Sequence, residues 1–171
     1  MFATSISLAP PLAGRQTRPP RARKPTPQGF ARGTLLRTIT GPRAVEQVMA
    51  GDLLLDADGQ IVELRSLVTR RANAQELVEI APSALGLGLA PGCLDRVLVI
   101  GAAQKLGLHD WRTELLYGKP ALTTAQALVD GLHVQPCTQD AMIYQLGFDR
   151  DCLIVANGLK ALVRASGAQT A

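Results

Sequence analysis

The chain has 171 residues, 47% of them apolar, which predicts a single domain with a substantial core. No apolar run approaches the roughly 18 residues of a membrane-spanning helix, so we expect no membrane partner. The formal charge of +4 is concentrated at the start, because residues 1–28 hold five bases and no acid. The remaining 13 bases and 14 acids leave residues 29–171 near neutral, without the basic face that binds phosphate groups.

Residues 1–28 form a segment rich in proline and arginine. Six of the eleven prolines fall here, with five bases between Arg15 and Lys24. Such a segment buries too little apolar surface to offset the entropy lost on ordering, so we expect a disordered basic tail. An organelle transit peptide is an alternative, as is nucleic-acid association through Arg15 to Lys24. A secretory signal is disfavoured because prolines interrupt the apolar stretch.

The first half of the body, beginning at Gly29, reads as a glycine turn, a short strand, one helical turn and further strands. Asp58-Gly59 favours a tight turn, so the strands on either side of it should form a hairpin. The expected strands of this half are Leu35–Ile39, Leu53–Leu55, Ile61–Val68 and Leu77–Ile80.

The second half follows a glycine-rich stretch, Ala84–Gly92, which lacks the Gly-Lys-Ser/Thr end of a P-loop and is interpreted as a plain loop. One of the pair Thr123-Thr124 is expected to cap a short helix at Ala125–Val129, which Gly131 ends. Asn157-Gly158 is the strongest hairpin signal in the chain. The expected strands of this half are Asp95–Ile100, Leu132–Val134, Met142–Phe148, Cys152–Ala156 and Leu159–Val163.

Many short strands, frequent glycine turns and only two short helical segments predict an all-β fold. An α/β fold would need helical patterns of about ten residues between strands, and the sequence lacks them. A weak internal echo supports a duplicated architecture. Ala44–Leu53 and Thr124–His133 both read as one helical turn, an apolar residue three before a glycine, and then a strand.

Several segments in order resemble the Hint (Hedgehog/intein) domain in its bacterial form. The opening carries Phe30, Gly33, Thr34, Val45-Glu46 and Gly51-Asp52 at the family's spacing, and the later matches are Trp111–Pro120, Leu128–Gly131 and Phe148–Asp151. The resemblance covers about residues 29–166. It implies an all-β horseshoe of short strands with pseudo-twofold halves and one or two short helical turns. Residues 1–28 would be the tail, 29–166 the domain and 167–171 a frayed end.

The same resemblance implies autocatalytic cleavage of the peptide bond before the first residue of the domain. A Cys, Ser or Thr attacks the preceding carbonyl, and a histidine assists the departing nitrogen. The equivalent positions here are Gly29 for the nucleophile, Lys105 for the helper histidine and Asp151 for a late histidine. We therefore expect a degenerate domain with no intact catalytic residue, no enzymatic activity and a remaining binding or structural role.

Other chemical groups leave alternatives open. An active domain could use an unrecognised nucleophile, for which Thr34 and Cys152 are candidates. The three cysteines, Cys93, Cys137 and Cys152, lack metal-ligand spacing, so no metal or other cofactor is expected. Buried free thiols fit a reducing compartment, which predicts a cytoplasmic protein. The partner is unknown from sequence.

Overall fold

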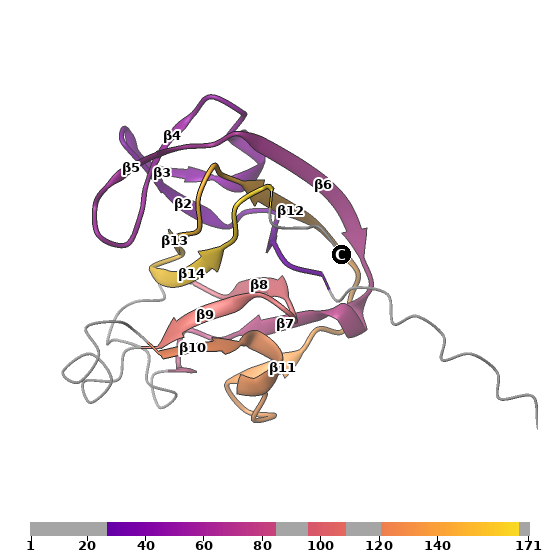
Figure 1. Ribbon diagram of the computed structural model, residues 1–171. Helices are drawn as coiled ribbons and strands as arrows, with labels where there is room; N and C mark the ends of the chain where they lie inside the picture. Colours follow the sequence, from indigo (N-terminus) through magenta and orange to yellow (C-terminus); the bar gives the residue numbers. More distant parts are fainter. Residues whose placement is uncertain (1–26, 85–95, 109–120, 168–171) are drawn as a thin grey trace, which may run out of the picture.

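The computed structural model describes residues 27–84, 96–108 and 121–167 (Figure 1). The described chain consists of strands and 3-10 turns, and no α-helix occurs within these ranges. The expected tail at Arg15–Lys24, the Trp111–Pro120 motif and most of the Ala84–Gly92 loop lie outside the described residues. Among the residues that are described, no helix has the length and hydropathy to cross a membrane.

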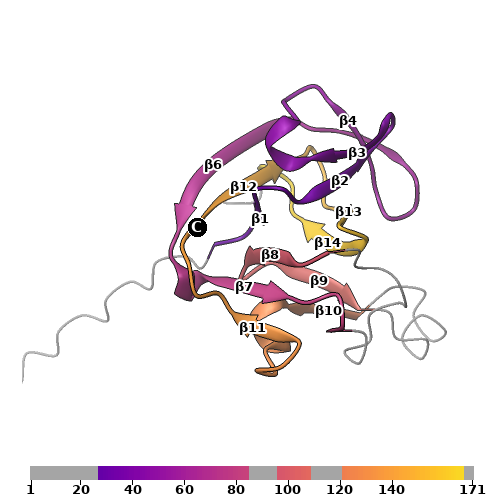
Figure 2. The same cartoon turned by 180° about the vertical axis from the view of Figure 1, so that it is seen from behind.

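The strands form two curled sheets (Figures 1 and 2). The six-stranded sheet has the order β11-β7-β8-β1-β12-β6, and the eight-stranded sheet has the order β10-β9-β14-β13-β2-β4-β5, with β3 paired to β2. The long strand β6 runs beside β12 along one side of the molecule and joins the part containing β2–β5 to the part containing β7–β11. The elements are β1 (Phe30–Ala31), β2 (Leu35–Thr38), β3 (Gly41–Ala44), η1 (Val45–Gln47), β4 (Leu53–Leu55), β5 (Ile61–Glu63), β6 (Ser66–Ala72), η2 (Ala74–Glu76), β7 (Leu77–Ile80), β8 (Leu98–Gly101), β9 (Lys105–Leu108), β10 (Ala121–Thr124), η4 (Ala125–Leu128), β11 (Val134–Pro136), β12 (Ala141–Gly147), β13 (Cys152–Ala156) and β14 (Leu159–Val163).

The expected internal duplication is confirmed in the backbone. In one half a turn ending at Thr34 leads into the hairpin β2–β3 and then η1, and in the other a turn ending at Gln104 leads into β9–β10 and then η4. The hydrogen bonds correspond, because Val45 N donates to Thr34 O at 2.8 Å and Ala125 N donates to Gln104 O at 2.9 Å. Thr34 and Gln104 therefore occupy equivalent places in the two halves.

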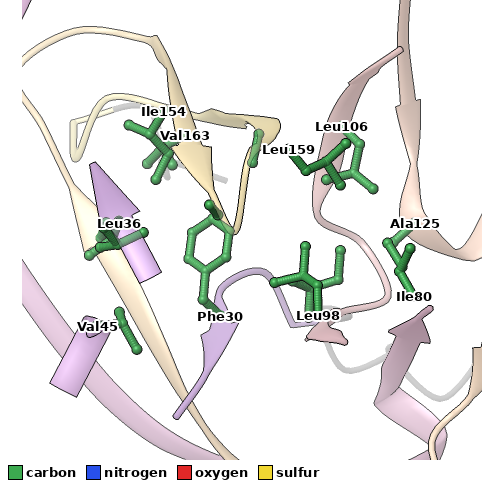
Figure 3. Close-up of a cluster of buried hydrophobic side chains, with 14 of the residues drawn as sticks. Phe30, Leu36, Val45, Ile80, Leu98, Leu106, Ala125, Ile154, Leu159 and Val163 are labelled. Atoms are coloured by element: carbon green, nitrogen blue, oxygen red, sulfur yellow. The ribbon is translucent and has the colours of Figure 1, made fainter. Parts of the chain in front are cut away.

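The hydrophobic core is centred on Phe30, which is fully buried (Figure 3). Its ring lies between Leu36 and Val45 on one side and Leu98 and Leu106 on the other, so residues from both halves pack around it. Full burial of such a side chain contributes about 1.5–3 kcal/mol. Because Gly29 precedes Phe30 directly, the anchored ring fixes the start of the domain in the middle of the molecule.

The prediction of one continuous strand at Ile61–Val68 is wrong, because the structure divides this segment between β5 and β6. β5 belongs to the eight-stranded sheet and β6 to the six-stranded sheet, so the chain changes sheets at Leu64-Arg65. Leu64 is fully buried, and its backbone exchanges hydrogen bonds with the Gly51-Asp52 turn. A continuous alternating sequence does not reveal this transfer, since both pieces have the periodicity of a strand.

The short helix expected at Ala125–Val129 is the 3-10 turn η4, and the threonine cap is wrong. Thr124 is the N-cap residue but makes no side-chain capping bond. The expected turn at Gly131 is confirmed, with a φ of +75°. The hairpin at Asn157-Gly158 is also confirmed, since both residues have positive φ, +47° and +87°.

Candidate functional site

The peptide bond between Gln28 and Gly29 lies between strands of the six-stranded sheet. Phe30 pairs with Tyr144 of β12 and with Ile100 of β8, so the segment before it is drawn in between them. Pro27 is buried and its carbonyl accepts a hydrogen bond from Ala103 N at 3.3 Å. The folded body therefore includes Pro27 and Gln28, two residues before the start expected at residue 29.

Gly29 occupies a place that has no room for a side chain. Its φ is +126°, which lies in the region that favours glycine. A Cβ built on this backbone would lie 2.7 Å from the carbonyl oxygen of Tyr144 and 3.1 Å from its carbonyl carbon. The obstruction is backbone of β12, which is paired on both sides, with β1 and with β6. No side-chain nucleophile fits at this position without a shift of the surrounding strands.

Gln104 is the side chain that meets the Gly29 amide. It is 2% exposed, and its Oε1 accepts a hydrogen bond from Gly29 N at 3.1 Å. Its Nε2 donates to Leu162 O at 2.7 Å and to Lys105 O at 3.2 Å. These three bonds fix which end of the amide faces Gly29, because the two carbonyls need a donor and the N–H needs an acceptor.

The hydrogen-bond partner of the Gly29 amide is thus neither Lys105 nor Asp151. Lys105 is a half-buried residue of β9 whose backbone pairs with Thr124 and Leu162. Asp151 is exposed and its Oδ1 accepts a hydrogen bond from Ala165 N at 2.7 Å. Sequence reasoning missed Gln104 by one residue. The sequence echo between Ala44–Leu53 and Thr124–His133 does not reach Gln104, and only the backbone shows that it ends its turn as Thr34 does in the other half.

A cleft of about 230 Å³ opens beside the Gln28–Gly29 bond. Two hydroxyls line it, those of Ser66 and Ser166, with their Oγ atoms 3.5 Å apart. No histidine, cysteine or carboxylate occurs among the described residues that line the cleft. The hydroxyls therefore lack an adjacent base of the kind that activates a serine.

The two alternative nucleophiles have structural roles. Thr34 is 3% exposed and its Oγ1 donates to Ala31 O at 2.7 Å, which closes the turn after β1. Cys152 is buried in the core, and desolvation, followed by the nearby Asp56 carboxylate, raises the pKa of its thiol to about 12. The thiol is therefore protonated at neutral pH and is a poor nucleophile.

This assignment predicts the order of cysteine labelling. Cys152 should react with iodoacetamide at pH 7.5 more than about 100-fold more slowly than in the unfolded chain, because its raised pKa and burial suppress the thiolate. Cys137 is the internal comparison, since burial and Glu79 raise its pKa only to about 11 and it is half-buried. Peptide mass spectrometry measures both rates. Labelling of Cys152 as fast as Cys137 would contradict its placement in the core.

Comparison with known proteins identifies the fold. The chain matches the Hint domain family over residues 28–162. It is similar to the crystal structure of the MchDnaB-1 intein (N145AA), with 20% identity, a TM-score of 0.51, and coverage of 80% of this chain and 99% of that one. It is also similar to the solution structure of a bacterial intein-like domain from Clostridium thermocellum, with 14% identity, a TM-score of 0.52, and coverage of 81% and 99%.

A search of curated proteins found no match. At these identities the structural likenesses establish the fold alone, and the family match covers most of the chain. The chain therefore belongs to the Hint domain family, and its all-β architecture is the one that the sequence predicted.

Proposed function

We propose that this protein is a Hint domain that does not cleave itself and that acts through binding or as a structural unit. The observation that carries the proposal is the identity of the side chain that meets the Gly29 amide, a glutamine, which takes up and releases no proton at neutral pH. In the hydrogen bond between them, the amide N–H is the donor and Gln104 Oε1 is the acceptor.

Self-cleavage requires a side chain that can deliver a proton to this nitrogen. When a nucleophile attacks the Gln28 carbonyl, the Gly29 nitrogen departs as an amine and must receive a proton. Gln104 presents a carbonyl oxygen to this nitrogen, and a carbonyl oxygen holds no proton. The donor end of the same side chain is already bonded to Leu162 O and Lys105 O. Gly29 itself carries no nucleophile at the first position, and its positive φ and the nearby Tyr144 backbone leave no room for a side chain there.

The purified chain is expected to stay whole when it is incubated with dithiothreitol or hydroxylamine at neutral pH. These reagents intercept a thioester or an ester; no cysteine is among the described residues that line the cleft, and its two serine hydroxyls have no histidine or carboxylate beside them in that lining. Intact-mass spectrometry over several days provides the measurement. A product that begins at Gly29 would overturn the proposal and support an active domain.

If that product formed, two matched variants would identify the unrecognised nucleophile. Ser66→Ala and Ser166→Ala each remove one hydroxyl of the cleft and leave the other in place. Loss of cleavage in one variant alone would assign the attack to that hydroxyl.

We also propose a cytoplasmic location, which the free thiols of Cys137 and Cys152 support.

A further inference from the structure

A second hollow lies on the outer face of the eight-stranded sheet and has a volume of about 420 Å³. In β2 the side chains of Leu36 and Thr38 point into the core, so Leu35 and Arg37 face the opposite way. Leu55 and Val155, from the neighbouring strands β4 and β13, join Leu35 in the lining. This groove is defined by Leu35, Arg37, Leu55, Arg96 and Val155. The strands that carry it lie together in the upper part of Figure 1.

The groove combines an apolar floor with a basic rim. Leu35, Leu55 and Val155 are half-buried, and Arg37 and Arg96 are exposed at its edge. Within the described part of the chain, neither guanidinium takes part in an ion pair, and none of the lining residues is acidic. By contrast, Arg43 is paired with Asp52, and Arg65 with Glu63 and Asp149. Two unpaired guanidinium groups beside an apolar surface complement a carboxylate that carries an apolar chain.

The groove is held in shape by Asn157. Its Oδ1 accepts a hydrogen bond from Leu35 N at 2.7 Å, and its Nδ2 donates to Val97 O at 3.3 Å. The side chain is buried, so it ties β2 to the segment that carries Arg96 and to the turn after β13. A hollow of this size, with mostly apolar lining and a few fixed polar groups, is typical of a small-molecule site.

The backbone of the floor favours a small molecule over an added peptide strand. A peptide that extends a sheet needs free N–H and C=O groups along its edge. All four residues of β2 pair with β3 on one side, and β4 and β13 pair with β2 on the other. An occupant that lies on β2, β4 and β13 is therefore held by side chains.

We propose that this groove binds a small amphiphilic carboxylate. Its apolar chain lies on Leu35, Leu55 and Val155, and its carboxylate is held by Arg37 and Arg96. The site is separate from the cleft beside Gln28–Gly29, with which it shares no lining residue. Binding in the groove therefore does not depend on whether the chain cleaves itself.

Calorimetric titration of the full chain with decanoate, below its micelle concentration, tests the proposal. Decan-1-ol keeps the apolar chain without the charge, and acetate keeps the charge without the chain. We expect one decanoate per chain, weaker binding of decan-1-ol and none of acetate. The Arg37→Gln/Arg96→Gln variant should weaken decanoate binding roughly 5- to 30-fold, as expected for two exposed charge pairs, and leave decan-1-ol unchanged.

Two further variants make the test specific. Arg150→Gln removes an exposed arginine outside the groove and should leave decanoate binding unchanged. Val155→Phe should fill the floor while suiting a strand, so it should weaken decanoate and decan-1-ol alike. The proposal is wrong if decanoate does not bind, binds at many sites, or binds the double arginine variant as tightly as the wild type. It is also wrong if only a peptide with a free C-terminus binds, or if the groove variants abolish self-association of the chain.

Discussion

The Gly29→Cys variant is expected to lose about 3–5 kcal/mol of folding stability, from backbone strain and from the steric clash together, and to gain no cleavage. A side chain at a φ of +126° strains the backbone, and its Cβ would lie 2.7 Å from the Tyr144 carbonyl oxygen. Restoring a thiol therefore costs stability and still leaves Gln104 as an acceptor at the departing nitrogen. Thermal and urea unfolding measure the first effect, and intact-mass spectrometry measures the second.

Gly59→Cys is the matched control for this variant. Gly59 also has a positive φ, +79°, but no atom lies within 4 Å of a Cβ built there. It should show the conformational penalty of about 1 kcal/mol without the steric clash. The difference between the two variants isolates the contact with Tyr144. Equal stability would show that β12 can move away from residue 29 and that a side chain fits there after all.

The Gln104→Leu variant is expected to lose about 2–5 kcal/mol, because it removes a hydrogen-bond partner from three backbone groups, Gly29 N, Leu162 O and Lys105 O. Leucine fills a similar volume but can neither accept from Gly29 N nor donate to Leu162 O. Gln126→Leu is the control. Gln126 is exposed on η4, so this substitution should change stability by less than about 0.5 kcal/mol. Urea denaturation at neutral pH compares the three chains. Similar midpoints for both variants would mean that water replaces the lost partners of Gln104.

Local signals were sufficient for much of the fold. Asn157-Gly158 predicted its hairpin because a two-residue turn with positive φ is read directly from those residue types. The duplicated segment after Ala44 and after Thr124 predicted the pseudo-twofold halves. Contacts between segments that are distant in sequence were harder to predict. β1, β3, β9 and β10 are short strands whose pairing partners decide their existence, and their own sequences give a weak pattern.

The candidate site was predictable in part for the same reason. The position of Gly29 followed from the spacing to Phe30 and Gly33, which lie in the same turn and strand. Gln104 lies 75 residues away from Gly29 in sequence, and a shift of one residue in an alignment exchanges it for Lys105. Alternation in the strand then reverses the direction of the side chain. The outer groove gave no sequence signal, because Arg37 and Arg96 come from segments that only folding brings together.

The three hydrogen bonds of Gln104 also bear on how long the native state persists. Two of them join the first described segment to β14, across separations of 75 and 58 residues. Contacts that close such long loops form late in folding, after the local hairpins have reduced the entropy of the chain. Interactions absent from the transition state slow unfolding more than they speed folding. The hydrogen bonds of Gln104 are therefore expected to slow unfolding and to lengthen the lifetime of the folded domain.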